Sequence, residues 1–207
     1  MKTYPSISKK PLKGIECYVF GKEDGSNLRV EWNVKHGFHR WGRRNGLLDD
    51  SNPILKRGPE IFLEKKMGDE LEAILRKEKI QDATLYFEFY GPSSFAGNHD
   101  ENEQQTLMLF DVSLKNKGLM PPHEFHKLFG HLSFSQRLLY VGNWTDELEK
   151  SIVEGRLEGM PLEGVVAKTR PENPRKPFVM WKCKNNAWLS LLKKKCGDDQ
   201  KLFELLS

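Results

Sequence analysis

The stretch Gly21-Lys22-Glu23-Asp24-Gly25-Ser26-Asn27 decides how this chain is interpreted. It lies between residues 15–20 and 28–32, two largely apolar runs that predict β-strands. A lysine at a strand end, followed by an acid and a glycine that lets a ligand approach the backbone, suits an amine nucleophile or a phosphate contact. Asp-Gly between two strands is also a strong hairpin signal, so an ordinary turn is the alternative. The rest of the chain has to decide between them.

Composition indicates a globular protein with a mildly basic surface. Of the 207 residues, 38% are hydrophobic and 11% aromatic, which is enough for a continuous core. The net charge of +4 is too small for a protein that coats nucleic acid by electrostatics alone. The basic residues gather in 35–44 and 168–195, and these segments would form a groove for polyphosphate or nucleic acid if the fold joins them.

The cysteines and the N-terminal sequence indicate a cytoplasmic protein. Cys17, Cys183 and Cys196 are odd in number and form no Cys-x-x-Cys pair, which argues against a disulfide framework and favours a reducing compartment. The N-terminal residues have no apolar core of a signal peptide, and no stretch approaches the roughly 18 apolar residues that cross a membrane. We expect no membrane partner.

The order of the expected elements predicts an α+β fold with mixed, largely antiparallel sheets and flanking helices. Strands are expected at residues 14–20, 28–32, 83–91, 106–112, 137–141, 164–168 and 178–184, with a further strand and turn in 38–48. Helices are expected from Pro59 to Leu75, and at 121–132, 146–154 and 188–195, with Asp146 and Glu149 spaced as a capping box. The polar loop 92–105 between two strands has a length typical of functional loops, and a second loop is expected at 171–176.

Charged residues inside apolar strands are the unusual feature of the remaining sequence. They are Glu88, Asp111, Glu163, Lys182 and Lys184. Strand alternation places Lys182 and Lys184 on one face. Each alone is typical of an outward-facing surface position, but several of both signs on several strands favour a shared polar pocket.

Six segments in order resemble the motifs of the covalent nucleotidyltransferases, which include ATP-dependent DNA ligases, RNA ligases and mRNA-capping guanylyltransferases. They are Lys22-Glu23-Asp24-Gly25, Arg44-Asn45-Gly46, Phe87-Glu88-Phe89-Tyr90-Gly91, Leu109-Phe110-Asp111-Val112, Glu163-Gly164-Val165-Val166-Ala167-Lys168 and Lys182-Cys183-Lys184-Asn185. The resemblance spans most of the chain and favours Lys22 as a nucleophile over a hairpin lysine. Gly21 departs from the pattern, because many relatives carry glutamate there.

The resemblance implies that Lys22 attacks the α-phosphate of ATP, expels pyrophosphate and becomes lysyl-AMP. It also implies roles for the other motif residues. Phe110 would stack on adenine, with Val165 or Val166 on the other face of the base. Glu88 would bind the ribose, Arg44 would bind a sugar or phosphate, and Lys182 and Lys184 would bind the phosphates. Glu163 and Glu88 would bind a Mg²⁺ or Mn²⁺ ion, and Asp24 would contact either Lys22 or the substrate end. AMP would then pass to a 5′-phosphate, and a 3′-hydroxyl would complete the joint.

Asn27 points to the RNA branch of the family. Gly25-Ser26-Asn27 resembles the Gly-Thr/Ser-Asn of nick-sealing phage-type RNA ligases, whereas DNA ligases commonly carry arginine at the last position. We therefore expect a monomer that joins RNA ends, with Asn27, Arg43 and Arg44 contacting nucleic acid. A DNA ligase reduced to its catalytic domain and a non-catalytic nucleic-acid-binding module are the alternatives.

The domain organisation expected is an adenylation domain at 1–187 and a short helix and tail at 188–207, which leaves no room for an OB domain. Lys193, Lys194 and Lys195 would contact backbone phosphates or form a solvated helix end. His123, His126 and His131 are not expected to bind zinc, because no second cluster of ligands accompanies them. Core packing is the expected use of Trp181 and Trp188.

Overall fold

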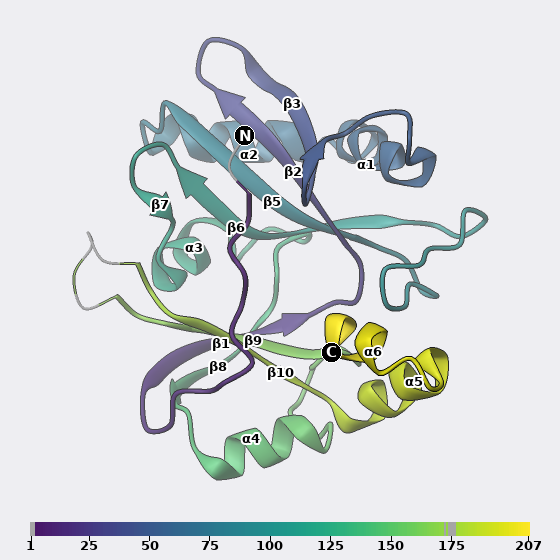
Figure 1. The fold of residues 1–207 in the computed structure, drawn as a ribbon. Helices are drawn as coiled ribbons and strands as arrows, with labels where there is room; N and C mark the ends of the chain where they lie inside the picture. Colours follow the sequence, from purple (N-terminus) through teal and green to yellow (C-terminus); the bar gives the residue numbers. More distant parts are fainter. Residues whose placement is uncertain (1–2, 172, 174–176) are drawn as a thin grey trace. The chain divides into compact units, whose positions relative to one another are not determined.

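The computed structural model describes residues 3–171, 173 and 177–207, and the chain divides into two compact units. Unit 1 comprises Gly25–Ser135 with the described residues up to Pro5, and unit 2 comprises Ser6–Asp24 and Gln136–Ser207. Each unit is built on one sheet whose strands pair antiparallel, with helices around it (Figure 1). The predicted α+β class with largely antiparallel sheets is confirmed.

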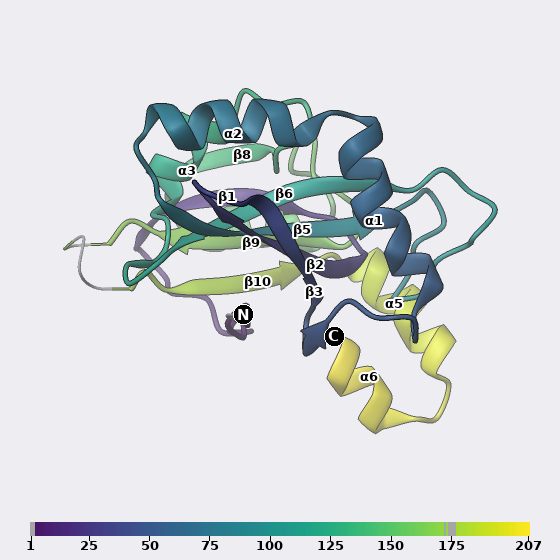
Figure 2. The ribbon, with the colours of Figure 1, turned by 90° about the horizontal axis from the view of Figure 1, so that it is seen from above.

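Unit 1 holds a six-stranded sheet in the order β4-β3-β2-β5-β6-β7. The strands are β2 (Ser26–Asn33), β3 (Gly37–Arg43), β4 (Gly46–Leu47), β5 (Asp82–Tyr90), β6 (Thr106–Leu114) and β7 (Gly118–Leu119). The helices are α1 (Pro53–Glu64), α2 (Met67–Lys77) and α3 (Pro122–Phe129), and α1 and α2 lie along one face of the sheet (Figure 2). Leu28, Val30 and Trp32 alternate along β2 and are fully buried, which leaves the polar residues between them to the opposite face.

The single helix expected from Pro59 to Leu75 is wrong in two respects. The first helix begins at Pro53, where the Asn52 side chain accepts a hydrogen bond from the amide of Leu55, and Pro59 lies inside it. The chain then breaks at Lys66, which has a left-handed φ of 51°. Apolar spacing continues across this break because both helices bury residues toward the same sheet, so periodicity alone could not reveal it.

Unit 2 holds a four-stranded sheet in the order β10-β9-β1-β8. Its elements are β1 (Glu16–Lys22), β8 (Leu138–Asn143), α4 (Asp146–Val153), β9 (Gly164–Thr169), β10 (Met180–Lys184), α5 (Asn186–Cys196) and α6 (Gln200–Leu206). Helix α4 covers a core that includes Val19, Trp144, Val165 and Trp181. Its N-cap is Thr145, whose hydroxyl accepts from the amide of Leu148, and not Asp146 as the capping-box spacing predicted.

Two other expectations concern the C-terminal part of unit 2. The helix expected at 188–195 is confirmed as α5, but the expected tail contains a further helix, α6. Positions 172 and 174–176 of the loop expected at 171–176 lie outside the described residues. The longest helix of the described chain, α1, has 12 residues, and none of the described helices is long and apolar enough to cross a membrane.

The hairpin alternative for the Lys22 turn is wrong. Strand β1 pairs with β8 and β9, whereas β2 pairs with β3 and β5, so the turn joins two different sheets. Gly25 is required where β2 begins, because a Cβ there would lie 2.3 Å from the carbonyl oxygen of Phe89. The Asp-Gly pair therefore serves a close backbone approach instead of a two-residue hairpin.

Candidate active site

Strand register in unit 2 brings the lysines of the first and last motifs onto one face. Lys22 on β1 and Lys184 on β10 both pair with Gly164 of β9. Lys182 pairs with Val166 in the adjacent row, two residues along β10. Because side chains alternate between the faces of a sheet, these residues share a face.

Glu163 joins two of these lysines through its carboxylate. Lys22 Nζ lies 2.7 Å from Glu163 Oε2, and Lys184 Nζ lies 2.8 Å from Glu163 Oε1. The Glu163 side chain is only 4% exposed, so water screens this pair of ion pairs weakly. Gly164 permits the arrangement, since a Cβ there would meet the carbonyl oxygen of Cys183 at 2.2 Å and push β9 from β10.

The same face is electrostatically suited to an anion. Burial, with Lys184, Lys9 and Lys22 nearby, lowers the pKa of Lys182 to about 8. Burial also lowers the pKa of Lys184, although Glu163 opposes this shift. Ammonium groups that lie this close repel one another, so bound phosphate oxygens would stabilise their charged forms.

The register also separates the two valines of the fourth motif. Val166 lies on the lysine face, 5% exposed. Val165 lies on the other face, fully buried in the cluster with Trp144 and Trp181. Val165 is thus a core residue, and the expectation that it could cover a base is corrected.

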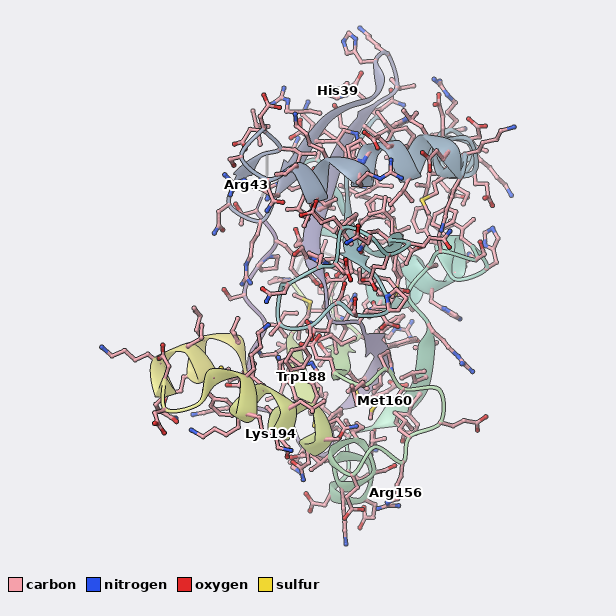
Figure 3. All side chains as sticks on the ribbon, turned by 90° about the vertical axis from the view of Figure 1, so that its right-hand side faces the viewer. His39, Arg43, Arg156, Met160, Trp188 and Lys194 are labelled. Carbon is pink, nitrogen blue, oxygen red and sulfur yellow. The ribbon has the colours of Figure 1, made fainter. Side chains whose placement is uncertain are left out.

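Helix α5 holds Asp24, a contact that the sequence did not predict. The Trp188 indole N–H donates to Asp24 Oδ2 at 2.6 Å, and the ring centroid lies 3.7 Å from Lys184 Nζ. Trp188 is nearly fully buried, on the inner side of α5, whereas Lys194 points away from it (Figure 3). Trp188 therefore packs as expected and also links two predicted site residues. Its place just after Lys184, at the start of a helix, was the available signal.

In unit 1, Asn27 and Glu88 lie on the face of the sheet opposite α1, whereas Arg43 pairs with Leu28 on the face that α1 covers. Asn27 on β2 is directly opposite Glu88 on β5. Phe110 on β6 is 9% exposed, next to a bulge between β5 and β6. Tyr4 packs edge-on against the Phe110 ring at 5.0 Å, and its hydroxyl donates to Asp111.

A buried arginine that the sequence did not reveal supports the Arg43–Arg44 turn. Arg29 is 2% exposed and donates to the carbonyl oxygens of Arg44 at 3.0 Å and Gly46 at 3.4 Å. Arg44 itself is exposed, and Arg43 pairs with Asp49 at 3.5 Å near the β3–β4 turn (Figure 3). Arg29 thus positions the turn that carries both predicted nucleic-acid contacts.

Glu163 is the residue of unit 2 that fits a divalent cation. Within residues 3–171, 173 and 177–207, no group of three or more histidine, cysteine or acidic side chains could hold a metal ion, the histidines on and after α3 included. Mg²⁺ at phosphoryl-transfer sites commonly takes one or two carboxylates together with substrate phosphates. A carboxylate beside lysines that are predicted to bind phosphate matches that chemistry. The second predicted ligand, Glu88, belongs to unit 1.

Comparison with solved structures identifies the fold. No protein-family model and no curated protein sequence matches the chain. The structure is similar to the Naegleria gruberi RNA ligase with PPi, at 20% identity and a TM-score of 0.64 over 94% of this chain and 58% of that one. Mutants of that ligase with ATP and Mn and with AMP and Mn give TM-scores of 0.64 and 0.63 at 20% identity, each over 92% of this chain and 58% of theirs.

The chain therefore spans less than two thirds of the ligase chains that it matches. Their likeness shows that this chain shares the fold of the N. gruberi RNA ligase structures over most of its length.

Proposed function

We propose that this chain is an ATP-dependent polynucleotide ligase of the RNA-ligase type, with Lys22 as the residue that carries AMP. The observation that supports this most is the Lys22–Glu163–Lys184 cluster, in which three predicted residues from separate segments meet. The fold of the N. gruberi RNA ligase, whose structures contain ATP, AMP or PPi, agrees with the proposal.

In the first step, the Lys22 amine attacks the α-phosphorus of ATP. A P–N bond forms, the bond from the α-phosphorus to the bridging oxygen breaks, and pyrophosphate leaves with the electron pair while the amine loses its protons to solvent. The contact with Glu163 favours the ammonium form of Lys22. Release of that contact leaves Lys22 beside Lys184 and Lys182, whose charges favour the neutral amine.

A divalent cation, when bound, would neutralise phosphate charge and engage Glu163. In this chain, Glu163 would hold it, with Glu88 as the second predicted ligand. Lys182 and Lys184 would stabilise the charge that develops on the departing phosphates. Asp24, held by Trp188, would fix the turn that begins at Lys22.

The remaining nucleotide contacts are proposed from the motif resemblance. Phe110 stacks on adenine, Val166 covers a base face, Glu88 binds the ribose, and Arg44 binds a sugar or phosphate. In the later steps, AMP passes from Lys22 to a 5′-phosphate and a 3′-hydroxyl displaces it, with Asn27, Arg43 and Arg44 contacting the strands. We place the adenylation domain at 1–187 and a helical segment at 188–207. We further propose that the protein is a cytoplasmic monomer and that it acts on RNA ends.

Labelling with ATP tests the proposal directly. The protein is incubated with α-labelled ATP and Mg²⁺, and acid-labile label on the protein is measured. Wild type should gain label and Lys22→Ala should gain none. Lys10→Ala is the control and should gain label like wild type, because Lys10 is exposed and lies outside the motifs. Equal labelling of Lys22→Ala and wild type would disprove the role of Lys22.

A further inference from the structure

Three lysines of unit 2 direct their ammonium groups at the end of helix α6. Lys182 Nζ lies 2.6 Å from the main-chain oxygen of Ser207, and Lys184 Nζ lies 2.8 Å from that of Leu206. Lys9 Nζ lies 2.9 Å from the carbonyl oxygen of Glu204 and 3.2 Å from Ser207 Oγ. Main-chain oxygens of one helical turn thus satisfy both phosphate-binding lysines of the last motif and one lysine outside every motif.

Lys9 reaches this position because its segment extends the sheet beside β10. The Ser8 amide donates to Met180 O at 3.2 Å, the Lys182 amide donates to Ser8 O at 2.9 Å, and the Ser8–Trp181 bridge is parallel. The next residues, Lys9 and Lys182, are therefore neighbours, and Lys9 is one of the cations that lower the pKa of Lys182.

Helix α6 presents an electrostatic substitute for phosphate. Main-chain carbonyl oxygens carry partial negative charge and accept hydrogen bonds from cations. Phosphate oxygens accept the same bonds with a full negative charge and therefore bind such a cluster more strongly. A polyphosphate that reaches the three lysines would compete with the last turn of α6.

Helix α6 is held with little burial of its side chains. All seven residues of α6 are described, none is buried, and Leu205 is 78% exposed. A helix of this length is not stable alone in water. Besides the contacts of the three lysines, Lys193 of α5 reaches α6 at Gln200 Oε1, 3.2 Å away, and at the Phe203 ring, whose centroid is 5.4 Å away.

We propose that Lys9, Lys182 and Lys184 form one oxyanion site for pyrophosphate or the pyrophosphate portion of ATP, and that the last turn of α6 occupies this site until the polyphosphate displaces it. Lys9 is the added ligand-binding residue, and α6 is an internal competitor. The assignment of ATP as the natural ligand rests on the proposed function, whereas the oxyanion site itself does not.

Pyrophosphate binding to the full chain, measured by calorimetry without ATP, tests both parts. Glu204→Pro removes a helical hydrogen bond and breaks α6, whereas Glu204→Ala keeps the helix and its carbonyl oxygens. If α6 is docked most of the time, Glu204→Pro should bind pyrophosphate about five- to tenfold more tightly than Glu204→Ala.

Lys9→Ala should bind pyrophosphate about fivefold more weakly than the control Lys10→Ala, which changes the next lysine in the sequence. Thermal unfolding checks that each variant remains folded.

Equal affinities of the two Glu204 variants, or weaker binding by Glu204→Pro, would overturn the role of α6. Equal affinities of Lys9→Ala and Lys10→Ala would overturn the role of Lys9. These results are separable from the ligase proposal, because pyrophosphate binding requires no lysyl-AMP. A protein that shows both affinity changes but gains no label from ATP keeps the oxyanion site and loses the ligase assignment.

Discussion

Glu163 holds two cations that have different tasks in the proposed reaction. Lys22 has to become a neutral nucleophile, while Lys184 has to stay charged to bind phosphate. One carboxylate oxygen contacts each of them, at 2.7 and 2.8 Å. Glu163 therefore keeps both side chains in place before the nucleotide binds, and its replacement should affect both.

The variant Glu163→Gln tests this arrangement. The amide keeps the shape of the side chain but loses its charge, so the two lysines repel each other without compensation. We expect labelling by α-labelled ATP to fall about 100-fold or more, because both positioning and metal binding are lost. Glu158→Gln, at an exposed position between α4 and β9, is the matched control. Labelling of Glu163→Gln within a few-fold of that control would contradict the role of Glu163.

Lys182 should make oxyanion binding depend on pH near neutrality. Its pKa is lowered from 10.5 to about 8 in the folded protein, so the ammonium is mostly present at pH 7 and mostly lost at pH 9. Pyrophosphate affinity should therefore fall over this interval. Lys182→Arg stays charged throughout. The ratio of wild-type to variant affinity at each pH cancels the change in ionisation of pyrophosphate itself, and a ratio that does not change would contradict the prediction.

The free energy of unfolding should also depend on the ionisation of Lys182, but it should rise with pH where pyrophosphate affinity falls. Between pH 8 and 10.5 the unfolded chain keeps a proton on Lys182 that the folded protein has lost. Stability attributable to Lys182 therefore rises with pH across this window and is lower below pH 8. Thermal unfolding of wild type and Lys182→Met at pH 7 and pH 9.5 measures it. The stability difference in favour of Lys182→Met should shrink at the higher pH, and no change would contradict the burial argument.

At the scale of elements, helix α5 connects the turn that follows Lys22 to strand β10. Trp188 in its first turn touches Asp24 through the indole N–H and Lys184 through the ring. The variant Trp188→Phe keeps a buried aromatic ring and removes only the donor. A hydrogen bond to a charged group contributes roughly 1.5–3 kcal/mol, so labelling should fall about 10- to 150-fold.

A double-mutant cycle separates this effect from packing. Trp188→Phe should have little further effect in an Asp24→Ala background if the hydrogen bond carries the loss, because the acceptor is already gone. Equal effects of Trp188→Phe in both backgrounds, measured by labelling, would show that ring packing is responsible.

The elements also show what could be predicted from the sequence. Alternation along 178–184 correctly placed Lys182 and Lys184 on one face, because strand periodicity is local. The contact of Glu163 with Lys22 depends on the pairing of β1 with β9, which are more than a hundred residues apart. Helix α6 lacked a signal because it buries none of its described residues, and the buried Arg29 looks like any outward-facing charge in a strand.

At the scale of the whole molecule, Asn27 is the residue that predicts the substrate. We expect nicked duplexes with RNA at the 3′-hydroxyl side to be sealed faster than all-DNA nicks, and joining assays on both measure this. All-DNA nicks sealed at least as well would indicate the DNA-ligase alternative.

Asn27→Ala should slow joining about tenfold or more and leave labelling of Lys22 within a few-fold, because Asn27 is proposed to contact the strands. Asn143→Ala, an exposed asparagine on β8, should change neither. Equal losses of labelling and joining in Asn27→Ala would instead place Asn27 in the nucleotide step.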